Sequence, residues 1–262
     1  MKLSATVELM KVHRSVRAYS RREVDEATLK SIISAAQCAA TSHFVQAYSV
    51  IRVQDREKRA AIADIAGSQK WVKTAPVFLI FCADFNRLET VGNQYGVPVE
   101  KGWAEQLIVA TVDAALLAQN VMLAAESLGL GGVFIGGIRN DPGAVCDLLA
   151  IPEQVYPVFG MCMGWPAKPL LQQDPAAQFS SSRDQEIKPR LPVEAVFFDD
   201  SYPEKHDPDL LADYDRRVKH YYLHRESNMR DETWTGQMAE FMGRIVRPHM
   251  KNFLMSRGFF HK

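Results

Sequence analysis

The sequence lacks the markers of several large protein classes. Lys and Arg number 31 and so do Asp and Glu, so the formal net charge is zero and the chain has no overall basic footprint for nucleic acid. Only four cysteines occur and none forms a CxxC pair, which argues against a zinc ribbon or a thioredoxin-type site. Cys82 and Cys162 lie inside apolar runs, so we predict that they are small buried hydrophobic residues. The first eight residues contain no apolar leader segment. We therefore expect a cytoplasmic protein without a nucleic-acid partner.

Several catalytic motifs are missing as well. The sequence contains no GxSxG elbow, no Walker A loop and no HExxH. Gly129, Gly131 and Gly132 follow a predicted helix and precede a predicted strand, which is the reverse of a dinucleotide-binding fingerprint. His220 and His224 have a spacing that zinc ligands can use, but no third ligand is evident, and we predict that they form a surface aromatic-polar helix face instead. We expect no bound metal.

The composition is that of a folded globular protein of 262 residues, with 47% hydrophobic and 24% charged residues. Hydrophobic periodicity predicts both helices and strands, and therefore an α+β protein. Asp25 is the predicted N-cap of one helix, and Asn140-Asp141-Pro142 is the predicted start of another. Helices are predicted at 5–12, 26–38, 55–65, 104–128, 141–149, 208–225 and 233–256, strands at 48–53, 77–82, 133–135 and 156–164, and loops at 87–102 and 167–186.

The segment 107–128 is apolar enough to require a membrane test. Its length is near that of a bilayer-spanning helix. However, Asp113, Gln119, Asn120 and Glu126 are spread along it, and such residues are costly in hydrocarbon. A helix that is apolar nearly all round is typical of a core or an interface. We expect no membrane association, and we expect Leu117 to lie in a contact between two subunits.

Two basic clusters suggest an anion site. His13, Arg14, Ser15 and Arg17 place imidazole, guanidinium and hydroxyl groups within one short segment, and Arg forks suit phosphate oxygens. The second cluster lies in residues 188–192, where prolines hold Lys188 and Arg190 in a fixed backbone. A solvated basic turn remains an alternative for the first cluster. Together, the two clusters are able to converge on one phosphate.

A pair of glycines follows the predicted strand 133–135. Gly136 and Gly137 lack a Cβ, so their backbone can approach a flat ligand closely. A plain tight turn is the alternative. From the residues alone, the sequence indicates an α+β protein with one phosphate-bearing ligand.

Read together, these motifs resemble the nitroreductase-like flavoproteins, in particular the NADPH-dependent branch of oxygen-insensitive nitroreductases and flavin reductases. The resemblance runs in order along nearly the whole chain. Its motifs lie at 13–17 (HRSVR), 41–46 (TSHFVQ), 67–70 (GSQK), 81–87 (FCADFNR), 125–132 (AESLGLGG), 134–140 (FIGGIRN), 164–166 (GWP) and 188–192 (KPRLP), and toward the C-terminus they continue with Tyr221-Tyr222-Leu223, Arg225, Ser227-Asn228 and Trp234.

The resemblance implies a fold and an assembly. We expect a mixed central sheet flanked by helices, an intertwined homodimer with a long central interface helix, and one FMN at each subunit interface. The chain would form a single FMN-binding domain over residues 1–262, with a C-terminal helical extension from about residue 205. The homodimer and small-molecule electron acceptors are the expected partners.

The resemblance also implies which residues bind FMN. His13, Arg14, Ser15, Val16 and Arg17 would lie at its phosphate together with Lys188, Pro189 and Arg190. The ribityl chain and the flavin edge would meet Thr41, Gln69, Lys70 and Trp71. Phe134, Ile135, Gly136 and Gly137 would pass under the isoalloxazine ring.

The expected activity is ping-pong, two-electron (hydride) transfer from NADPH through FMN to nitroaromatics, quinones or free flavin. The cofactor would carry the chemistry, so no catalytic side chain is expected. A non-catalytic FMN-binding sensor or carrier is the alternative. Arg225 and Arg230 are predicted to bind the 2′-phosphate of NADPH, because Arg forks suit phosphate. Internal pairing of these arginines with Glu226, Asp231 and Glu232 would instead leave a neutral surface loop.

Overall fold

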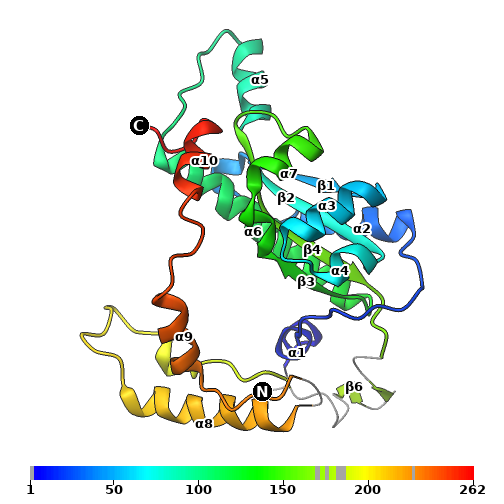
Figure 1. Cartoon of the computed structure of the whole chain (residues 1–262), viewed down its shortest axis with the longest axis vertical. Coiled ribbons are helices and arrows are strands. Elements are labelled where there is room, and N and C mark those ends of the chain that lie inside the picture. The colour runs from blue at the N-terminus through cyan, green and yellow to red at the C-terminus, as the bar shows by residue number, and fades with distance from the viewer. Residues whose placement is uncertain (1–2, 169–171, 175–176, 181–186, 226–227) are drawn as a thin grey trace. The chain divides into compact units, whose positions relative to one another are not determined.

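The computed structural model describes residues 3–168, 172–174, 177–180, 187–225 and 228–262, and most of its helices and strands are labelled in Figure 1. The chain forms two compact units. The sheet unit comprises Ser15–Pro169 and Arg247–Lys262, and the helical unit comprises Met1–Arg14 and Leu170–Val246.

The sheet unit contains a four-stranded sheet with strand order β1-β2-β4-β3. Each of its three pairings is antiparallel, whereas a mixed sheet was expected. The four predicted strands are confirmed, and their ends differ from the expected ones by no more than two residues. They are β1 (Tyr48–Arg52), β2 (Val77–Asp84), β3 (Gly131–Ile135) and β4 (Val155–Gly164).

Strand β2 is buried along its whole length. Val77, Leu79 and Phe81 belong to the core on one face of the sheet, which also includes α2 and α6. Phe78 and Ile80 belong to the second core, on the other face. Successive side chains of a strand point to opposite faces, so β2 contributes to both cores at once.

Helices therefore cover both faces of this sheet (Figure 1). The predicted N-caps are present, because the Asp25 carboxylate accepts the Thr28 N–H at 2.8 Å and Asp141 accepts the Ala144 N–H at 3.0 Å. The helices of this unit are α2 (Glu26–Ala36), α3 (Arg56–Ile65), α4 (Lys70–Thr74), α5 (Asn86–Gln94), α6 (Ala104–Ser127), α7 (Pro142–Leu149) and α10 (Met250–Ser256).

Helix α6 is long and apolar enough to cross a membrane by length and composition, but it packs inside the sheet unit against α2 and the sheet. Leu117 is 1% exposed in this core, so the expectation that it lies in a contact between subunits is wrong. A different face of α6 is free in the subunit. Ile108, Val112 and Leu116 follow one another at four-residue spacing and are 44–56% exposed.

Three other local predictions are wrong. The predicted loop 87–102 contains α5, because the helix continues through Gly92 and ends only at Gln94. The predicted helix 233–256 is split into α9 (Trp234–Met242) and α10. Pro248 lies between them, and it favours a break because proline disfavours helical geometry in the residue before it. In the predicted loop 167–186, β5 (Gln172–Asp174) pairs with β6 (Ala177–Ser180). The remainder of that loop, at 169–171, 175–176 and 181–186, lies outside the described residues.

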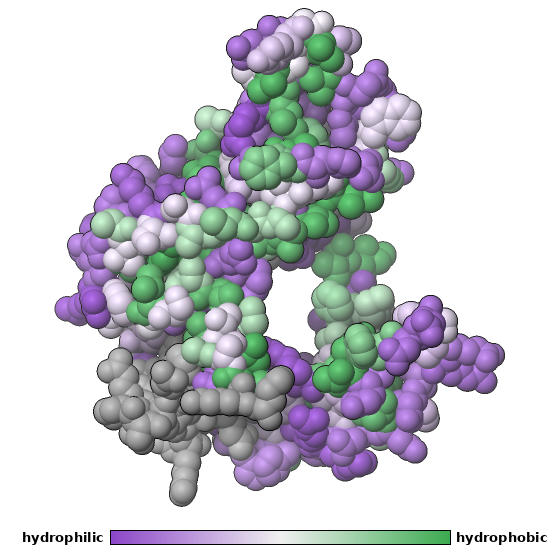
Figure 2. Space-filling view, turned by 180° about the vertical axis from the view of Figure 1, so that it is seen from behind, coloured by the Kyte–Doolittle hydropathy of each residue, from purple (hydrophilic) through white to green (hydrophobic). Residues whose placement is uncertain are grey.

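The helical unit contains α1 (Ala5–Lys11), α8 (Pro208–His224), α9 and the β5–β6 hairpin. Tyr214, Val218 and Tyr222 lie on one face of α8 and form a small buried cluster with Leu191 and Trp234 packed against it. Large hydrophobic side chains of this unit also reach the surface, and hydrophobic surface is visible beside α9 in Figure 2.

Three of the four thiols are buried in the sheet unit. Burial raises the pKa of Cys82, that of Cys146 to about 11 and that of Cys162 to about 12. Cys38 is exposed. The prediction that Cys82 and Cys162 are small buried hydrophobic residues is confirmed.

Candidate functional site

The N-terminal basic cluster spans the boundary between the two units, because Arg14 ends a segment of the helical unit and Ser15 begins the sheet unit. The Val16 N–H donates to the Gly132 carbonyl at 2.8 Å, which attaches this segment to β3. The Tyr19 hydroxyl donates to the carbonyl oxygens of Val16, at 2.7 Å, and Cys162, at 3.1 Å. Burial raises the pKa of Tyr19, so its hydroxyl stays a donor. The backbone that precedes Arg17 is therefore fixed.

A second part of the candidate site is the turn between α3 and α4. Gly67 and Ser68 both have positive φ, at 85° and 56°. The Gln69 side chain donates to the Ala66 carbonyl at 2.8 Å and accepts from Trp71 Nε1 at 2.9 Å. These bonds fix Trp71, and the Arg17 guanidinium lies 5.6 Å from its ring centroid. Lys70 is exposed at the start of α4.

The glycine pair lies against this turn. A Cβ on Gly137 would fall 2.6 Å from the Ala66 carbonyl oxygen, and one on Gly136 would fall 3.2 Å from the Arg139 guanidinium. The close backbone approach at Gly137 is therefore made to Ala66 of the same chain. Both glycines begin a 3₁₀ helix, Gly136–Asn140, so the alternative of a tight turn describes them best.

Before the glycine pair, β3 presents two different side chains. Phe134 is 36% exposed and packs edge to face on Phe159 at 5.1 Å between ring centroids. Ile135 is buried in the core. Of these two residues, only Phe134 offers side-chain surface to a ligand.

Thr41 lies in a third segment, just before β1. Its hydroxyl oxygen is buried and has no hydrogen-bond partner in the described part of the chain. A buried hydroxyl without a partner is unfavourable, so this atom is suited to a polar group of a ligand.

In the helical unit, α8 fixes the second basic cluster. The Tyr214 hydroxyl donates to the Pro189 carbonyl at 3.1 Å. Lys188 Nζ lies 5.1 Å from the ring centroid of Tyr222. Burial raises the pKa of Tyr222, but hydrogen bonds with Lys188 and Gln237 and the charges of Lys188 and Arg225 outweigh it and lower that pKa. Burial raises the pKa of Tyr214, and the positive charge of the exposed Arg190 partly offsets this rise.

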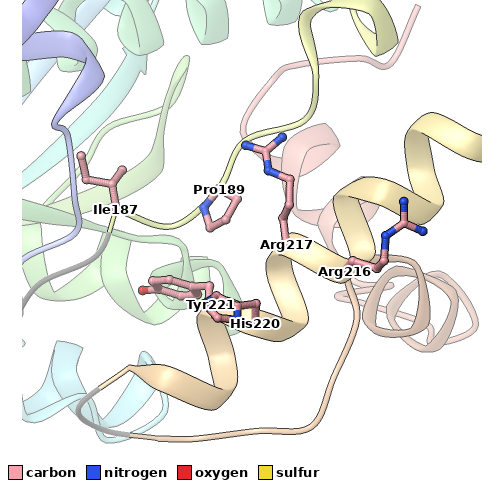
Figure 3. A pocket seen from close by; sticks show the side chains of 6 residues that line it. All are labelled: Ile187, Pro189, Arg216, Arg217, His220 and Tyr221. Carbon is pink, nitrogen blue, oxygen red and sulfur yellow. The ribbon is translucent and has the colours of Figure 1, made fainter.

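A pocket of about 440 Å³ opens between this cluster and α8 (Figure 3). Arg216 pairs with Asp213 at 3.1 Å, whereas Arg217 has no ion pair with a described residue. The pocket is cationic and partly aromatic. Its lining residues are Ile187, Pro189, Arg216, Arg217, His220 and Tyr221.

Arg225 and Arg230 follow on the same unit. Arg225 Nε donates to the Asn228 carbonyl at 3.0 Å, and its guanidinium lies 4.5 Å from the ring centroid of Tyr222. Arg230 forms an exposed ion pair with Glu232 at 3.5 Å. Asp231 pairs with Lys219 instead, at 2.6 Å. Glu226 and Ser227 lie outside the described residues.

The predicted surface role of the histidine pair fits the structure. The rings of His220 and His224 stack at 4.1 Å between centroids, and His224 Nδ1 lies 2.8 Å from the His220 carbonyl oxygen. No cluster of three or more His, Cys, Asp or Glu residues suited to a metal occurs among the described residues.

Each unit thus brings together part of the predicted site. The sheet unit gathers Arg17, Gln69, Trp71 and Gly137 around Ala66. The helical unit places both Lys188 and Arg225 against the ring of Tyr222. His13 and Arg14 belong to that unit as well. The meeting of Arg17 and Lys188 at one phosphate stays a prediction.

Sequence reasoning missed the tyrosines that fix these segments. Tyr19, Tyr214 and Tyr222 contact residues distant in sequence, and nothing in their local pattern indicates it. The spacing of Tyr214, Val218 and Tyr222 was the one available signal, because it predicts a common helix face.

Comparison with known proteins identifies the class to which this fold and site belong. The profile of the Nitroreductase family matches residues 10–165, and that of the Nitroreductase family, C-terminal domain matches residues 188–262. The chain belongs to the nitroreductase family.

Individual relatives match over almost their whole length. An oxygen-insensitive NADPH nitroreductase of Salmonella typhimurium is 41% identical, over 98% of this chain and 98% of its own. A protein of Pseudomonas sp. named CR(VI) reductase is 40% identical, over 96% and 98%. The structure of the NADPH:FMN oxidoreductase from Vibrio harveyi complexed with NAD+ has a TM-score of 0.85 at 34% identity, over 99% of this chain and 100% of that chain.

Proposed function

We propose that this protein is an FMN-dependent NADPH oxidoreductase that reduces small organic acceptors by two electrons. The observation that carries the proposal is the full-length similarity to proteins named NADPH nitroreductase, NADPH-flavin oxidoreductase and FMN reductase. The protein is an oxidoreductase, FMN is its cofactor and NADPH its electron donor. These relatives give no support to a sensor or carrier without turnover.

Cationic side chains and a buried hydroxyl without a described partner support the assignment of FMN to these residues. A phosphate requires cations and hydrogen-bond donors. In this proposal they come from the side chains of His13, Arg14, Ser15, Arg17, Lys188 and Arg190, while Val16 and Pro189 contribute backbone. The unpartnered Thr41 hydroxyl would meet a polar atom of the ribityl chain or the ring. Gln69, Lys70 and Trp71 would lie along the flavin edge.

The ring would lie over the segment Phe134, Ile135, Gly136 and Gly137. Because Ala66 already occupies the space beside Gly137, this glycine would support the ring indirectly, by letting the 66–71 turn pack close to β3. Phe134 offers the exposed surface of this segment.

Bound FMN supplies the redox chemistry, by accepting a hydride from NADPH and passing two electrons to the acceptor. The protein's contribution is position and electrostatics. Lys188 would place positive charge beside the cofactor, held by its contact with Tyr222. No side chain of the described site is required as a catalytic acid or base. We infer nitroaromatics, quinones and free flavin as the acceptor class.

The decisive measurement follows the flavin absorbance band of the purified protein under anaerobic conditions. We expect stoichiometric NADPH to bleach the band within one turnover, and a quinone or nitroaromatic acceptor to restore it. If the band persists after addition of both NADPH and NADH, the oxidoreductase proposal fails.

The phosphate assignment predicts a loss of FMN from variants. Each truncation, Arg17→Ala or Lys188→Ala, removes a charge-assisted hydrogen bond worth about 1.5–3 kcal/mol. Each single variant should purify with less FMN per chain, and the double variant should be largely colourless. Arg216→Ala serves as a control, because Arg216 is paired with Asp213. Normal FMN content in all three site variants would contradict the assignment.

Arg225 and Arg230 are predicted to select NADPH over NADH. Among the described residues Glu232 pairs with Arg230, and exposed ion pairs of this kind are weak, so the Arg230 guanidinium remains available to a 2′-phosphate. Arg225 donates to the Asn228 carbonyl through Nε and Nη2, so a 2′-phosphate would use its remaining N–H donors. Arg225→Ala should raise the KM for NADPH about tenfold and change the KM for NADH little, with a similar or smaller effect of Arg230→Ala.

The salt dependence provides an independent check, because an exposed phosphate contact is screened by ions. The difference between Arg225→Ala and the unaltered protein should shrink as the salt concentration rises. Equal efficiency of the unaltered protein with NADPH and NADH, or variants that lose both cofactors alike, would rule out this role.

We also propose a cytoplasmic homodimer that binds neither nucleic acid nor membrane. The support is the exposed apolar face Ile108, Val112 and Leu116 of α6, which a second copy would cover. Light scattering should give about twice the chain mass of 29.5 kDa. Leu116→Asp should shift the mass toward the monomer, because it would bury an unpaired charge, whereas Val91→Asp on α5 should not. A dimer undisturbed by Leu116→Asp would contradict this interface.

A further inference from the structure

Asp113 is a buried carboxylate at the middle of α6 that the redox chemistry does not use. It is 1% exposed and has no ion pair with a described residue. Its two oxygens accept the backbone N–H of Ser42 at 3.1 Å and that of Ala47 at 3.0 Å. Burial of a charged group is unfavourable unless it is hydrogen-bonded, so these contacts are needed to keep the carboxylate in the core. Asp113 therefore ties α6 to both ends of the segment 42–47.

The segment that Asp113 holds is strained. His43, Phe44 and Gln46 have positive φ values of 46°, 57° and 51°. Residues other than glycine rarely adopt this region, and they persist there only where surrounding contacts hold them. The Asp113 hydrogen bonds are such contacts.

Arg87 contacts the end of the same segment and the start of β1. Its guanidinium donates to the carbonyl oxygens of Gln46 and Tyr48, each at 3.2 Å. Two charged side chains from different helices thus fix one short loop. Asp113 accepts hydrogen bonds from backbone N–H groups of the loop, and Arg87 donates hydrogen bonds to backbone carbonyl oxygens at its end. A connection held by this many hydrogen bonds from charged side chains indicates that its conformation has a role beyond joining α2 to β1.

Two buried hydroxyls without partners flank the loop. Thr41 Oγ1 and Tyr48 Oη have no hydrogen-bond partner in the described part of the chain. Burial, and next the Asp113 charge, raise the pKa of Tyr48, so its hydroxyl stays protonated close to that carboxylate. Thr41 directly precedes Ser42, and the Ser42 N–H donates a hydrogen bond to Asp113. The Asp113 contact therefore sets where the Thr41 hydroxyl lies.

We propose that Asp113 is a positioning residue, which holds the loop 41–47 so that the Thr41 hydroxyl meets bound FMN. This inference rests on the proposed function. Asp113 itself lies inside the core and acts through the Ser42 and Ala47 backbone, without touching the cofactor.

The test compares Asp113→Asn with Thr111→Val in the FMN-loaded full chain. The Asn side chain keeps the shape but can offer only one acceptor to the two N–H groups. Thr111 lies two positions earlier on α6, and its hydroxyl contacts Leu107 and Tyr156 instead of the loop. Three readouts are needed: thermal unfolding, FMN release on dilution followed by fluorescence, and hydrogen exchange of the peptide that covers 42–47.

We expect both variants to lower the unfolding temperature. Only Asp113→Asn should also raise the FMN dissociation constant, by about tenfold, and speed exchange in the 42–47 peptide. If Asp113→Asn does not fold, Ser42→Pro tests the contact from the loop side, because it removes one of the two N–H donors. Thr41, the residue before it, is already extended, at φ −136° and ψ 153°, as a following proline requires. Ser42→Pro should raise the FMN dissociation constant in the same direction.

The outcomes separate this proposal from the proposed function. If the unaltered protein holds FMN and is bleached by NADPH, but Asp113→Asn or Ser42→Pro releases FMN no faster than Thr111→Val, the positioning role is overturned and the oxidoreductase stands. If the unaltered protein holds no FMN, the proposed function fails and this role fails with it.

Discussion

The burial of β2 on both faces is the constraint on which the rest of the sheet unit depends. A strand whose alternate side chains enter two cores requires helices on both sides of the sheet. Helix α6 fills one side, and α3, α4 and α7 fill the other. The two faces serve the site differently, because Asp113 reaches the 42–47 loop from α6, while Gln69 and Trp71 lie in the turn and helix after α3.

Rigid backbone, more than any single charged group, characterises the candidate site. The segments that carry Arg17, Trp71, Lys188 and Thr41 are each fixed by hydrogen bonds from side chains distant in sequence or from their own turn. A reductase that alternates between a donor and an acceptor requires a cofactor held in one place, and pre-organised contacts provide this without reordering at each exchange. Arg225, which is half-buried, and Arg230, which is exposed, lie outside these segments.

The sequence predicts the sheet strands well because their apolar runs are bounded by turn residues, and it predicts the caps at Asp25 and Asp141 because capping is local chemistry. The sequence does not predict the burial of a side chain or its contact partner where these depend on segments distant along the chain. Leu117 and Leu116 are chemically identical neighbours, and only the packing of α6 makes one buried and the other exposed. Likewise, the motif around Gly137 predicts a close approach, but the partner of that approach, Ala66, is known only from the fold. The sequence predicts a loop in place of α5, because the Gly, Pro and polar residues of 87–102 favour turns.

The burial of the thiols has a consequence for the chemistry that surrounds such an enzyme. Quinones and the reduction products of nitroaromatics are electrophiles, and the thiolate is the form of cysteine that reacts with them. Cys82, Cys146 and Cys162 are enclosed in the core, and their raised pKa values keep them protonated at neutral pH. Only the Cys38 thiol lies exposed to solvent, so if the proposed acceptors are the substrates, the other three thiols of the sheet unit would be shielded from covalent damage by them.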